Sequence, residues 1–375
     1  MPHAGKCRSF KAPHPIDKFE RFAPDSRPKP SPEPKPFCDM TISLESIPSF
    51  TPAEALTVAD QEFGLVGRVS ALPSERDQNF LLTDSDGGKF VLKIANVNDA
   101  AQILDLQNQA MRHVEKSTAD CCVQRVIVSR RGLDYTVIHN DRAGTDHCVR
   151  MLTWIDGEVL ANSASRGPRL FDSIGASMAK VDAALSGFVH PAMHRVLQWD
   201  LRHAGMAREN ASLLSPERRA RVERVFLQWE RIDWTALRHS VIHGDANDYN
   251  VIVGAGRMVG LLDFGDMVCT ATVCDLAIAL AYCMLGEQEP LSVAAQIIRA
   301  YQRHYPLTDA ELQALFPLIL TRLSMSVCYS AHNRVRNPDD PYQVVTEAAA
   351  WDLLDKLECW SPEDALKLIR TACAA

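Results

Sequence analysis

Apolar and polar positions alternate in the first part of the chain with the two-residue period of β-strands. Two helical patterns accompany them, one over about residues 52–62 and one over 98–117, whose apolar side is supplied by Ile103, Leu104, Leu106, Met111 and Val114. Strands are predicted for short runs between Gly, Pro, Asn and Asp residues, at 68–72, 79–83, 89–94, 123–129, 136–139 and 148–152. This part of the chain is therefore expected to form a small antiparallel sheet with helices beside it.

From about residue 166 onward the apolar spacing changes to that of helices. Helices are predicted at 170–185, 216–231, 274–285, 292–304, 309–333, 342–357 and 362–372. Only two polar loops, near 243–250 and 261–265, interrupt this helical pattern. The predicted fold class is α+β, with an N-lobe over 40–155 and a larger, mostly helical C-lobe over 156–375.

The first 39 residues differ from the rest, because they hold nine of the 21 prolines together with scattered Lys and Arg. Such a segment buries too little apolar surface to order itself, so we predict a disordered tail. It lacks the apolar core of a secretory signal. Met40 begins more ordinary sequence and is a candidate initiator.

Composition and charge narrow the function classes. The 375 residues are 46% hydrophobic and carry a net charge of −7, without a long basic run, so nucleic acid is not an expected partner. No run approaches the roughly 18 consecutive apolar residues of a membrane span. The eleven cysteines include the adjacent Cys121-Cys122 and no pair of C-x-x-C knuckles. We therefore expect reduced thiols in a cytoplasmic protein without a zinc site.

The residues that suggest chemistry gather in two segments. The first reads His243-Gly244-Asp245-Ala246-Asn247-Asp248-Tyr249-Asn250, and the second reads Leu261-Leu262-Asp263-Phe264-Gly265. Metal-dependent phosphoryl transfer needs a carboxylate near the nucleophile, an amide oxygen nearby and a second carboxylate for the metal. The alternative is that Asp245 and Asn250 only cap a turn or a helix. The order and spacing of the two segments favour the catalytic interpretation.

These two segments resemble the catalytic and metal-binding loops of the aminoglycoside phosphotransferase family. The resemblance implies a bilobal, protein-kinase-like fold and transfer of a phosphoryl group from a nucleotide. It also implies Asp245 as the catalytic base, Asn250 and Asp263 as Mg²⁺ ligands, and His243 as a scaffold residue of its loop.

Upstream residues fit the same resemblance as a nucleotide-binding part. Lys93, in the strand Phe90-Val91-Leu92-Lys93-Ile94, resembles the lysine that pairs with donor phosphates. Ser74 and Asn79 lie where a phosphate-covering loop is expected, and they either contact phosphate or only shape the turn. Leu152 and Trp154 flank a segment that resembles the hinge meeting the purine. In kinases the following helix gives the lysine a glutamate, but here the position expected to face Lys93 is Gln107, with Asp105 and Glu115 as nearby acids.

Within the family, phrases such as Asp77-Gln78-Asn79-Phe80 and Arg150-Met151-Leu152-Thr153 resemble the hydroxylysine kinase branch. This resemblance spans roughly residues 65–357 and implies a GTP-dependent transfer to the 5-hydroxyl of free 5-hydroxylysine. Kinases acting on choline, ethanolamine, homoserine or aminoglycosides share the same core and remain alternatives, as does a non-catalytic nucleotide-binding relative. The expected partners are thus GTP or ATP and a small hydroxylated amine or amino acid, without nucleic acid or membrane.

Three charged residues are candidates for binding this acceptor. Asp266 and Asp200 could meet an ammonium group, and Arg322 could bind a carboxylate through its planar fork. Each has a structural alternative: Asp266 could cap a helix, Asp200 could pair with Arg202 or Arg195, and Arg322 could fix the packing of its helix.

Overall fold

The computed structural model describes residues 47–74, 76–99, 101–117, 123–164, 166–336 and 346–374. The predicted tail over residues 1–39 lies outside the described residues, as does the start of the helix predicted at 342–357. The residues described here all belong to the compact unit Ile42–Ala375.

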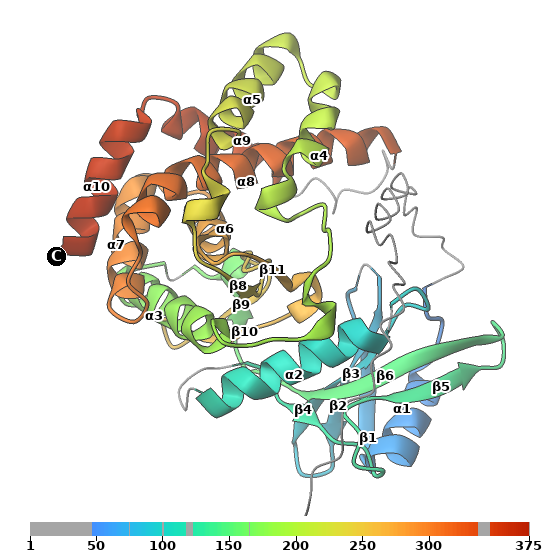
Figure 1. Ribbon diagram of the computed structural model, residues 1–375. Coiled ribbons are helices and arrows are strands. Elements are labelled where there is room, and N and C mark those ends of the chain that lie inside the picture. Colours follow the sequence, from blue (N-terminus) through green and yellow to red (C-terminus); the bar gives the residue numbers. More distant parts are fainter. Residues whose placement is uncertain are drawn as a thin grey trace, which may run out of the picture. The chain divides into compact units, whose positions relative to one another are not determined.

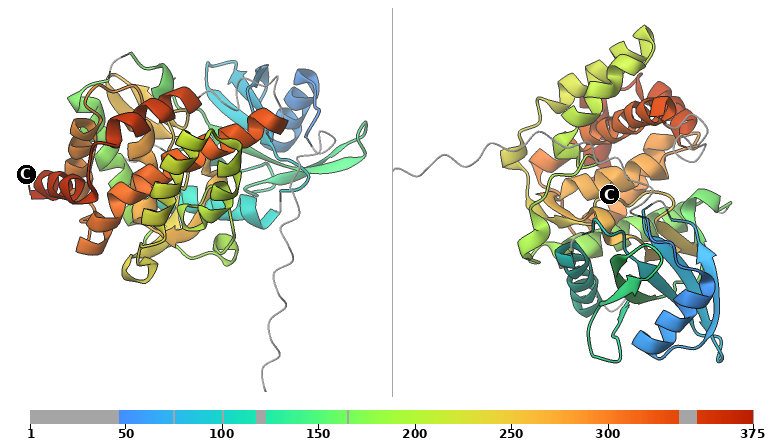
Figure 2. Two further views of the ribbon diagram at one scale, coloured as in Figure 1. Left: turned by 90° about the horizontal axis from the view of Figure 1, so that it is seen from above. Right: turned by 90° about the vertical axis from the view of Figure 1, so that its right-hand side faces the viewer.

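The N-terminal part is an antiparallel sheet, as predicted (Figure 1). Its strands are β1 (Gly67–Leu72), β2 (Gln78–Asp84), β3 (Lys89–Ile94), β4 (Val126–Ile127), β5 (Thr136–Asn140) and β6 (Thr145–Thr153). The order is β1-β2-β3-β6-β4, and β5 pairs with β6 in a hairpin that the left view of Figure 2 shows extending past the other strands. The strand predicted at 123–129 is shorter than expected, and Val123 forms only an isolated bridge to Leu261.

Two helical segments flank this sheet. The first, α1 (Pro52–Val58), continues as a π-helix over Ala59–Phe63, and it begins with a capping box in which Thr51 and Glu54 bond each other's backbone N–H. The second, α2 (Ala101–Ser117), buries Leu104, Leu106, Met111 and Val114. The 3.6-residue spacing seen in the sequence therefore does mark the inner face of α2.

The remainder is mostly helical, as expected. Its helices are α3 (Pro168–Leu185), α4 (Gly205–Arg208), α5 (Pro216–Trp229), α6 (Val273–Cys283), α7 (Pro290–Gln302), α8 (Asp309–Arg336), α9 (Glu347–Leu357) and α10 (Pro362–Ala374). By length and composition α8 could cross a membrane, but 94% of its most apolar window is buried inside the structure. It contacts α5, α6, α9 and α10 and is the central helix of this part.

The prediction that only loops interrupt these helices was wrong, because short strands carry those loops. One set pairs β10 (Arg257–Leu261), β9 (Val251–Gly254) and β7 (Glu158–Val159), and another pairs β8 (His239–Ile242) with β11 (Val268–Ala271). Most residues of β8, β9 and β11 are buried, so they do not alternate in polarity and the period-two signal is missing. The first predicted loop joins β8 to β9, and the second joins β10 to β11.

Candidate active site

The loop after β8 is held in place by hydrogen bonds from its backbone amides and from the His243 ring to groups elsewhere in the chain. The amides of His243 and Gly244 donate to the two carboxylate oxygens of Asp275 at 3.1 and 2.8 Å. The His243 ring donates from Nε2 to the carbonyl of Leu262 at 2.9 Å, which ties this loop to the metal loop. Gly244 has φ +83°, and a Cβ there would overlap the carbonyl oxygen of Asp266. Only glycine fits this position without strain.

Asp245 stands at the centre of the loop and accepts hydrogen bonds on both oxygens. Oδ2 accepts from the side-chain amides of Asn247 and Asn250, each at 2.9 Å, and Oδ1 accepts from Nη2 of Arg322 at 2.9 Å. Burial raises the pKa of the Asp245 carboxyl, while the Arg322 guanidinium opposes that shift. This carboxylate is oriented by its neighbours and has the geometry of a proton acceptor.

Asp263 faces Asp245 from the metal loop. Its backbone has φ +57°, a conformation that non-glycine residues rarely adopt and that often marks functional sites. Oδ1 accepts from the amide of Gly265 at 3.2 Å and lies 3.7 Å from Nζ of Lys93. The charge of Lys93 lowers the pKa of the Asp263 carboxyl, so this acid is ionised.

The two loops carry oxygen donors of the kind that bind a divalent cation. The Asn250 amide nitrogen donates to Asp245 Oδ2 and to its carbonyl, which directs the Asn250 amide oxygen away from them. Mg²⁺ is usually bound by one or two carboxylates together with phosphate and water oxygens. Asp263 could supply one carboxylate to such a cation, and Asn250 could supply an amide oxygen. Across the described ranges there is no cluster of three or more His, Cys, Asp or Glu that could hold a metal.

The acids near Lys93 come from loops and not from α2. Nζ of Lys93 lies 3.9 Å from Asp77 and 3.7 Å from Asp263. The expectation that Gln107 faces Lys93 needs correction, because Gln107 Oε1 accepts from Nη2 of the buried Arg150 at 2.5 Å. Arg150 on β6 is the direct cross-strand partner of Lys93 on β3. Because directly paired residues point to the same side of a sheet, the two side chains lie on one face.

The other predicted nucleotide residues lie around this lysine. Asn79 is the cross-strand neighbour of Lys93, and within the described structure its buried Oδ1 has no hydrogen-bond partner. Ser74 is exposed in the connection between β1 and β2. Leu152 is buried in the core, whereas Trp154 is half-buried and its backbone amide donates to the carbonyl of Lys89 at 3.1 Å. The structure thus gathers Asn79 and Lys93 and places the Leu152 side chain in the core.

The predicted acceptor residues have different surroundings. Arg322 is 3% exposed, and besides Asp245 it donates from Nη1 to the carbonyl of Trp199 at 3.1 Å. Its guanidinium lies 4.5 Å from the Trp199 ring centre and 5.4 Å from that of Tyr282. Nε of Arg322 is buried and has no hydrogen-bond partner in the part of the chain that the structure describes.

The two predicted acids are not equivalent. Asp200 accepts from the hydroxyl of Thr270 at 3.0 Å and from the backbone amide of Arg202 at 3.0 Å, so it caps a short turn. Burial and the charge of Asp245 raise the pKa of the Asp266 carboxyl to about 6. Both acids and Trp199 line a cavity of about 10 Å³ beside Gly244.

Sequence reasoning missed two residues that shape the site. Asp275 anchors the catalytic loop from α6, and Arg195 donates from Nε to the carbonyl of Met267 at 2.8 Å and from Nη2 to that of Gly265. Arg195 therefore clamps the metal loop. Neither position carries a local signal, since each acts on a backbone that is distant in sequence. Asp77 was part of a recognised phrase, but nothing in the sequence assigned it to Lys93.

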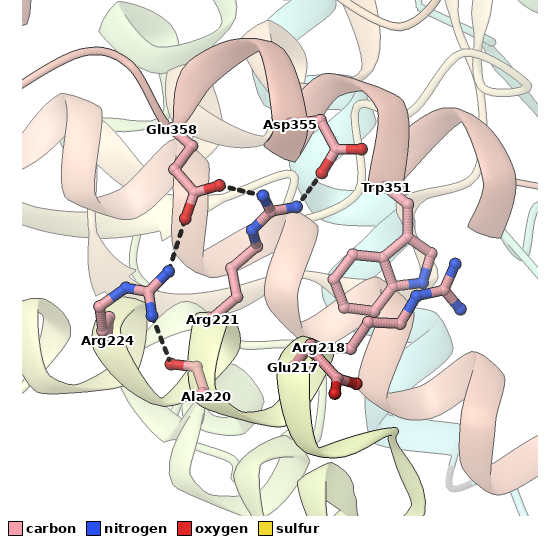
Figure 3. Close-up of a pocket in the computed structure, with 8 residues that line it drawn as sticks. All are labelled: Glu217, Arg218, Ala220, Arg221, Arg224, Trp351, Asp355 and Glu358. Carbon is pink, nitrogen blue, oxygen red and sulfur yellow. Dashed lines mark hydrogen bonds and ion pairs between the residues drawn. The ribbon is translucent and has the colours of Figure 1, made fainter.

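A larger cavity lies elsewhere, between α5 and α9. It measures about 470 Å³ and is lined by Glu217, Arg218, Ala220, Arg221, Arg224, Trp351, Asp355 and Glu358. Figure 3 shows Arg221 between Asp355 and Glu358, and Arg218 over the ring of Trp351. Because its arginines are matched by acids and the catalytic loops do not line it, we interpret it as a polar contact between helices.

Comparison with known proteins points to one chemistry. A model of the phosphotransferase enzyme family matches residues 68–312. The hydroxylysine kinase of Mus musculus is 30% identical over 341 residues, which cover 83% of this chain and 90% of that protein.

Solved structures agree on the fold. A microcompartment-associated aminopropanol kinase has a TM-score of 0.67 at 14% identity, covering 84% of this chain and 99% of its own. An amicoumacin kinase, solved with AMP-PNP, Ca²⁺ and its ligand, has a TM-score of 0.65 at 15% identity, covering 84% of this chain and 97% of its own. The bilobal kinase-like α+β fold expected from the sequence is therefore confirmed.

Proposed function

The chain belongs to the phosphotransferase enzyme family, and from this premise we propose that it phosphorylates the hydroxyl of an amino-acid-like acceptor, 5-hydroxy-L-lysine, with GTP or ATP as donor. The family makes the chain a small-molecule phosphotransferase. The observation that carries the acceptor is the similarity to hydroxylysine kinases over most of the chain.

In the proposed mechanism Asp245 accepts the proton of the acceptor hydroxyl as its oxygen attacks the γ-phosphorus, and the bond from that phosphorus to the β–γ bridging oxygen breaks to release the nucleoside diphosphate. The contacts from Asn247, Asn250 and Arg322 hold this carboxylate in place, so little reorganisation is needed. A proton acceptor of this kind typically contributes on the order of 10²–10⁴ to the rate.

Asn250 and Asp263 are the proposed holders of a divalent cation, which would neutralise charge on the donor phosphates. Lys93 is proposed to pair with those phosphates, and Asn79 and Ser74 are proposed to lie beside it. The segment from Leu152 to Trp154 is proposed to face the purine ring of the nucleotide. The Asp77 and Asp263 carboxylates keep the ammonium of Lys93 at the phosphate side of the sheet.

For the acceptor we propose Asp266 as the main contact of an ammonium group. Burial and, after it, the charge of Asp245 raise the pKa of its carboxyl, which indicates that the Asp266 carboxyl lies near Asp245. Asp200 stays a candidate for the same role, although its known contacts are structural. The proposed carboxylate contact at Arg322 would use the guanidinium edge at Nε, because Nε has no hydrogen-bond partner within the described structure, whereas Nη1 and Nη2 each donate to the protein.

A panel of acceptors crossed with GTP and ATP tests the proposal. It contains 5-hydroxylysine, homoserine, 1-amino-2-propanol, ethanolamine, choline and an aminoglycoside, each assayed with Mg²⁺. We expect kcat/KM for 5-hydroxylysine to exceed the others by at least about tenfold, since a polar site rejects analogues that leave its groups unpaired. A higher value for any other member would replace the acceptor assignment.

Two controls separate true transfer from background. Lysine, which lacks the hydroxyl, should not be phosphorylated. Asp245→Asn should lower kcat by on the order of 10²–10⁴ while the affinity for Mg·nucleotide stays within about threefold. Turnover within tenfold of the parent would exclude Asp245 as the base.

A further inference from the structure

A buried pair of carboxyl groups lies beneath the catalytic loop. Asp182 on α3 and Asp275 on α6 are both fully buried. Burial raises the pKa of Asp182 well above its usual range, and the charge of Asp275 and a side-chain hydrogen bond with it raise that pKa further. Two carboxyl groups in contact inside a protein cannot both be ionised at moderate cost, so one of them retains a proton.

The hydrogen bonds around the pair indicate which one. Asp275 accepts two backbone amides, those of His243 and Gly244, at 3.1 and 2.8 Å. Donors of this kind favour the ionised form of a carboxyl group. Asp182 accepts only the Tyr301 hydroxyl, on Oδ2, at 2.6 Å. Its other oxygen, Oδ1, is buried and has no hydrogen-bond donor within the described structure.

A proton on Oδ1 of Asp182 accounts for the absence of a hydrogen-bond donor to this atom in the described structure. As a carboxylate oxygen it would be buried without a donor, which is costly. As an O–H it donates to Asp275, and every oxygen of the pair is then satisfied. The titratable groups that act on Asp182 from the surrounding elements are acids, phenols and a thiol, namely Asp275, Glu311, Tyr301, Tyr305 and Cys274. None of these supplies a positive charge.

We propose that Asp182 is held as a neutral carboxylic acid that donates its proton to Asp275, and that this hydrogen bond positions the catalytic loop. Asp182 touches no reacting atom, so it is a positioning residue. Its effect runs through Asp275 to the amides of His243 and Gly244, which immediately precede Asp245. The functional part of this inference rests on the proposed role of Asp245, whereas the protonation state does not.

The packing between α3 and α7 keeps Asp182 and Tyr301 together. A Cβ on Gly175, two turns before Asp182, would overlap the carbonyl oxygen of Ile297 on α7. The two helices therefore approach each other closely at this glycine. Asp182 itself is fully buried, so bulk water does not solvate a charge on it.

Asp182→Asn distinguishes the titration of the carboxyl group from its hydrogen bonding. The amide can still donate to Asp275 and accept from Tyr301, but it cannot titrate. Asp182→Ala removes both functions. Asp172→Asn is the matched control, because Asp172 also lies on α3 facing α7 but pairs with Arg299 at 3.5 Å.

The first measurement is infrared absorption of the full chain in D₂O. The parent should show a C=O band of a protonated carboxyl group near neutral pH. That band should be absent from Asp182→Asn and retained in Asp172→Asn. A band that persists unchanged in Asp182→Asn would show that Asp182 is ionised and would overturn the proposal.

The second measurement is equilibrium unfolding in urea against pH. Because the pKa of Asp182 is raised in the folded state, its stabilising contribution is complete below the unfolded pKa and is lost as pH rises through the folded pKa. Relative to Asp182→Asn, the unfolding equilibrium constant of the parent should rise by up to about tenfold per pH unit above about pH 4. Equal pH dependence in both proteins would contradict the proposal.

The third measurement is activity. Asp182→Asn should keep kcat within about threefold of the parent, whereas Asp182→Ala should lose at least about tenfold in kcat. Equal kcat in the two variants would show that the hydrogen bond to Asp275 does not position the loop. If Asp182→Ala does not fold, the infrared band and the pH dependence of unfolding in Asp182→Asn still decide whether Asp182 is protonated. Those two measurements need no acceptor, so a failed acceptor assignment is distinguishable.

Discussion

Arg322 is a buried cation on α8 that donates a hydrogen bond to the candidate base, Asp245. The sequence suggested a carboxylate contact, since a guanidinium interrupts an apolar helical run. The structure places that guanidinium 2.9 Å from Asp245, between the rings of Trp199 and Tyr282. Its role toward the acceptor stays a prediction, but its contact with the candidate base implies an effect on turnover as well.

Replacing Arg322 with Ala should therefore change two kinetic constants. kcat should fall for every acceptor, because Asp245 loses a charged donor and a buried pair broken on one side is left uncompensated. KM should rise for acceptors with a carboxylate only, by about tenfold or more, so that decarboxylated acceptors lose their disadvantage. Steady-state kinetics with 5-hydroxylysine and its decarboxylated analogue measures both.

Arg334→Ala is the matched control for this substitution. It removes a guanidinium from the same helix, α8, but one that pairs with Glu347. We expect neither kinetic constant to change by more than about twofold, because the Arg334 side chain is 53% exposed and its carboxylate partner Glu347 lies on α9, outside the catalytic loops. Equal losses in KM for both classes of acceptor in Arg322→Ala would show that Arg322 acts only through the base.

Asp266 should give the acceptor dependence a pH signature. Burial raises the pKa of its carboxyl to about 6, so the group is neutral below that pH and charged above it. An ammonium needs the charged form, and kcat/KM for the acceptor should fall as pH decreases through about 6. Asp266→Asn should have lower kcat/KM at pH 8 and a ratio to the parent that approaches one at pH 5. A constant ratio across this range would remove Asp266 from the acceptor site.

At the scale of elements, the acid near the strand lysine has a different origin from the one expected of a kinase. The expected acid is a glutamate on α2, whereas here an acid from the connection between β1 and β2 lies near Lys93. The helix presents amides in place of an acid, and Gln107 and Asn108 accept from the buried Arg150 at 2.5 and 2.9 Å. The connection between β1 and β2 presents Asp77 to Lys93 instead. The helix is therefore tied to the sheet without using the phosphate-facing lysine.

This arrangement predicts different outcomes for two substitutions. Asp77→Asn should raise the nucleotide KM by about fivefold, as expected for a partly exposed ion pair worth about 1 kcal/mol. Gln107→Ala should leave that KM unchanged but lower the free energy of unfolding by about 1–3 kcal/mol, because it strands a buried donor of Arg150. The pair of measurements is steady-state kinetics and urea unfolding. A raised nucleotide KM in Gln107→Ala, together with an unchanged KM in Asp77→Asn, would show that α2 and not Asp77 acts on Lys93.

The sequence predicted the long elements well and the short ones poorly, for physical reasons. α2 and β2 each have one face that is less buried than the other, and the contrast between faces produces a readable period. β8 has no such contrast because three of its four residues are buried. At the site, Asp245 and Asp263 were readable because each lies within a short contiguous motif, His243 to Asn250 for the first and Leu261 to Gly265 for the second. Asp275 and Asp77 were not, because they act on partners more than ten residues away.

At the scale of the whole molecule, the sheet and the helical part meet where Lys93 approaches Asp263. A metal-bound nucleotide would contact both residues, so its binding should stabilise both parts together. At a concentration of 100 Kd, a ligand that binds only the folded state contributes about 2.7 kcal/mol.

Thermal unfolding with nucleotide should therefore depend on Mg²⁺. We expect Mg·nucleotide to raise Tm more than the nucleotide with EDTA, and Asp263→Asn to lose this metal-dependent increment. Asp266→Asn, three residues further on, should keep it, since that acid is assigned to the acceptor. An increment that survives in Asp263→Asn would place the metal elsewhere.

The contact between Arg322 and Asp245 also bears on how this enzyme could diverge. Arg322 contacts the candidate base, and in the proposed function the same side chain binds the acceptor, so a mutation there would alter selectivity and reaction rate together. A lineage acquiring a new acceptor would lose turnover by changing Arg322, whereas changing Asp266 leaves the base contacts intact. We therefore expect natural drift and laboratory selection for new acceptors to retain Arg322 and to vary Asp266 and the residues around Trp199.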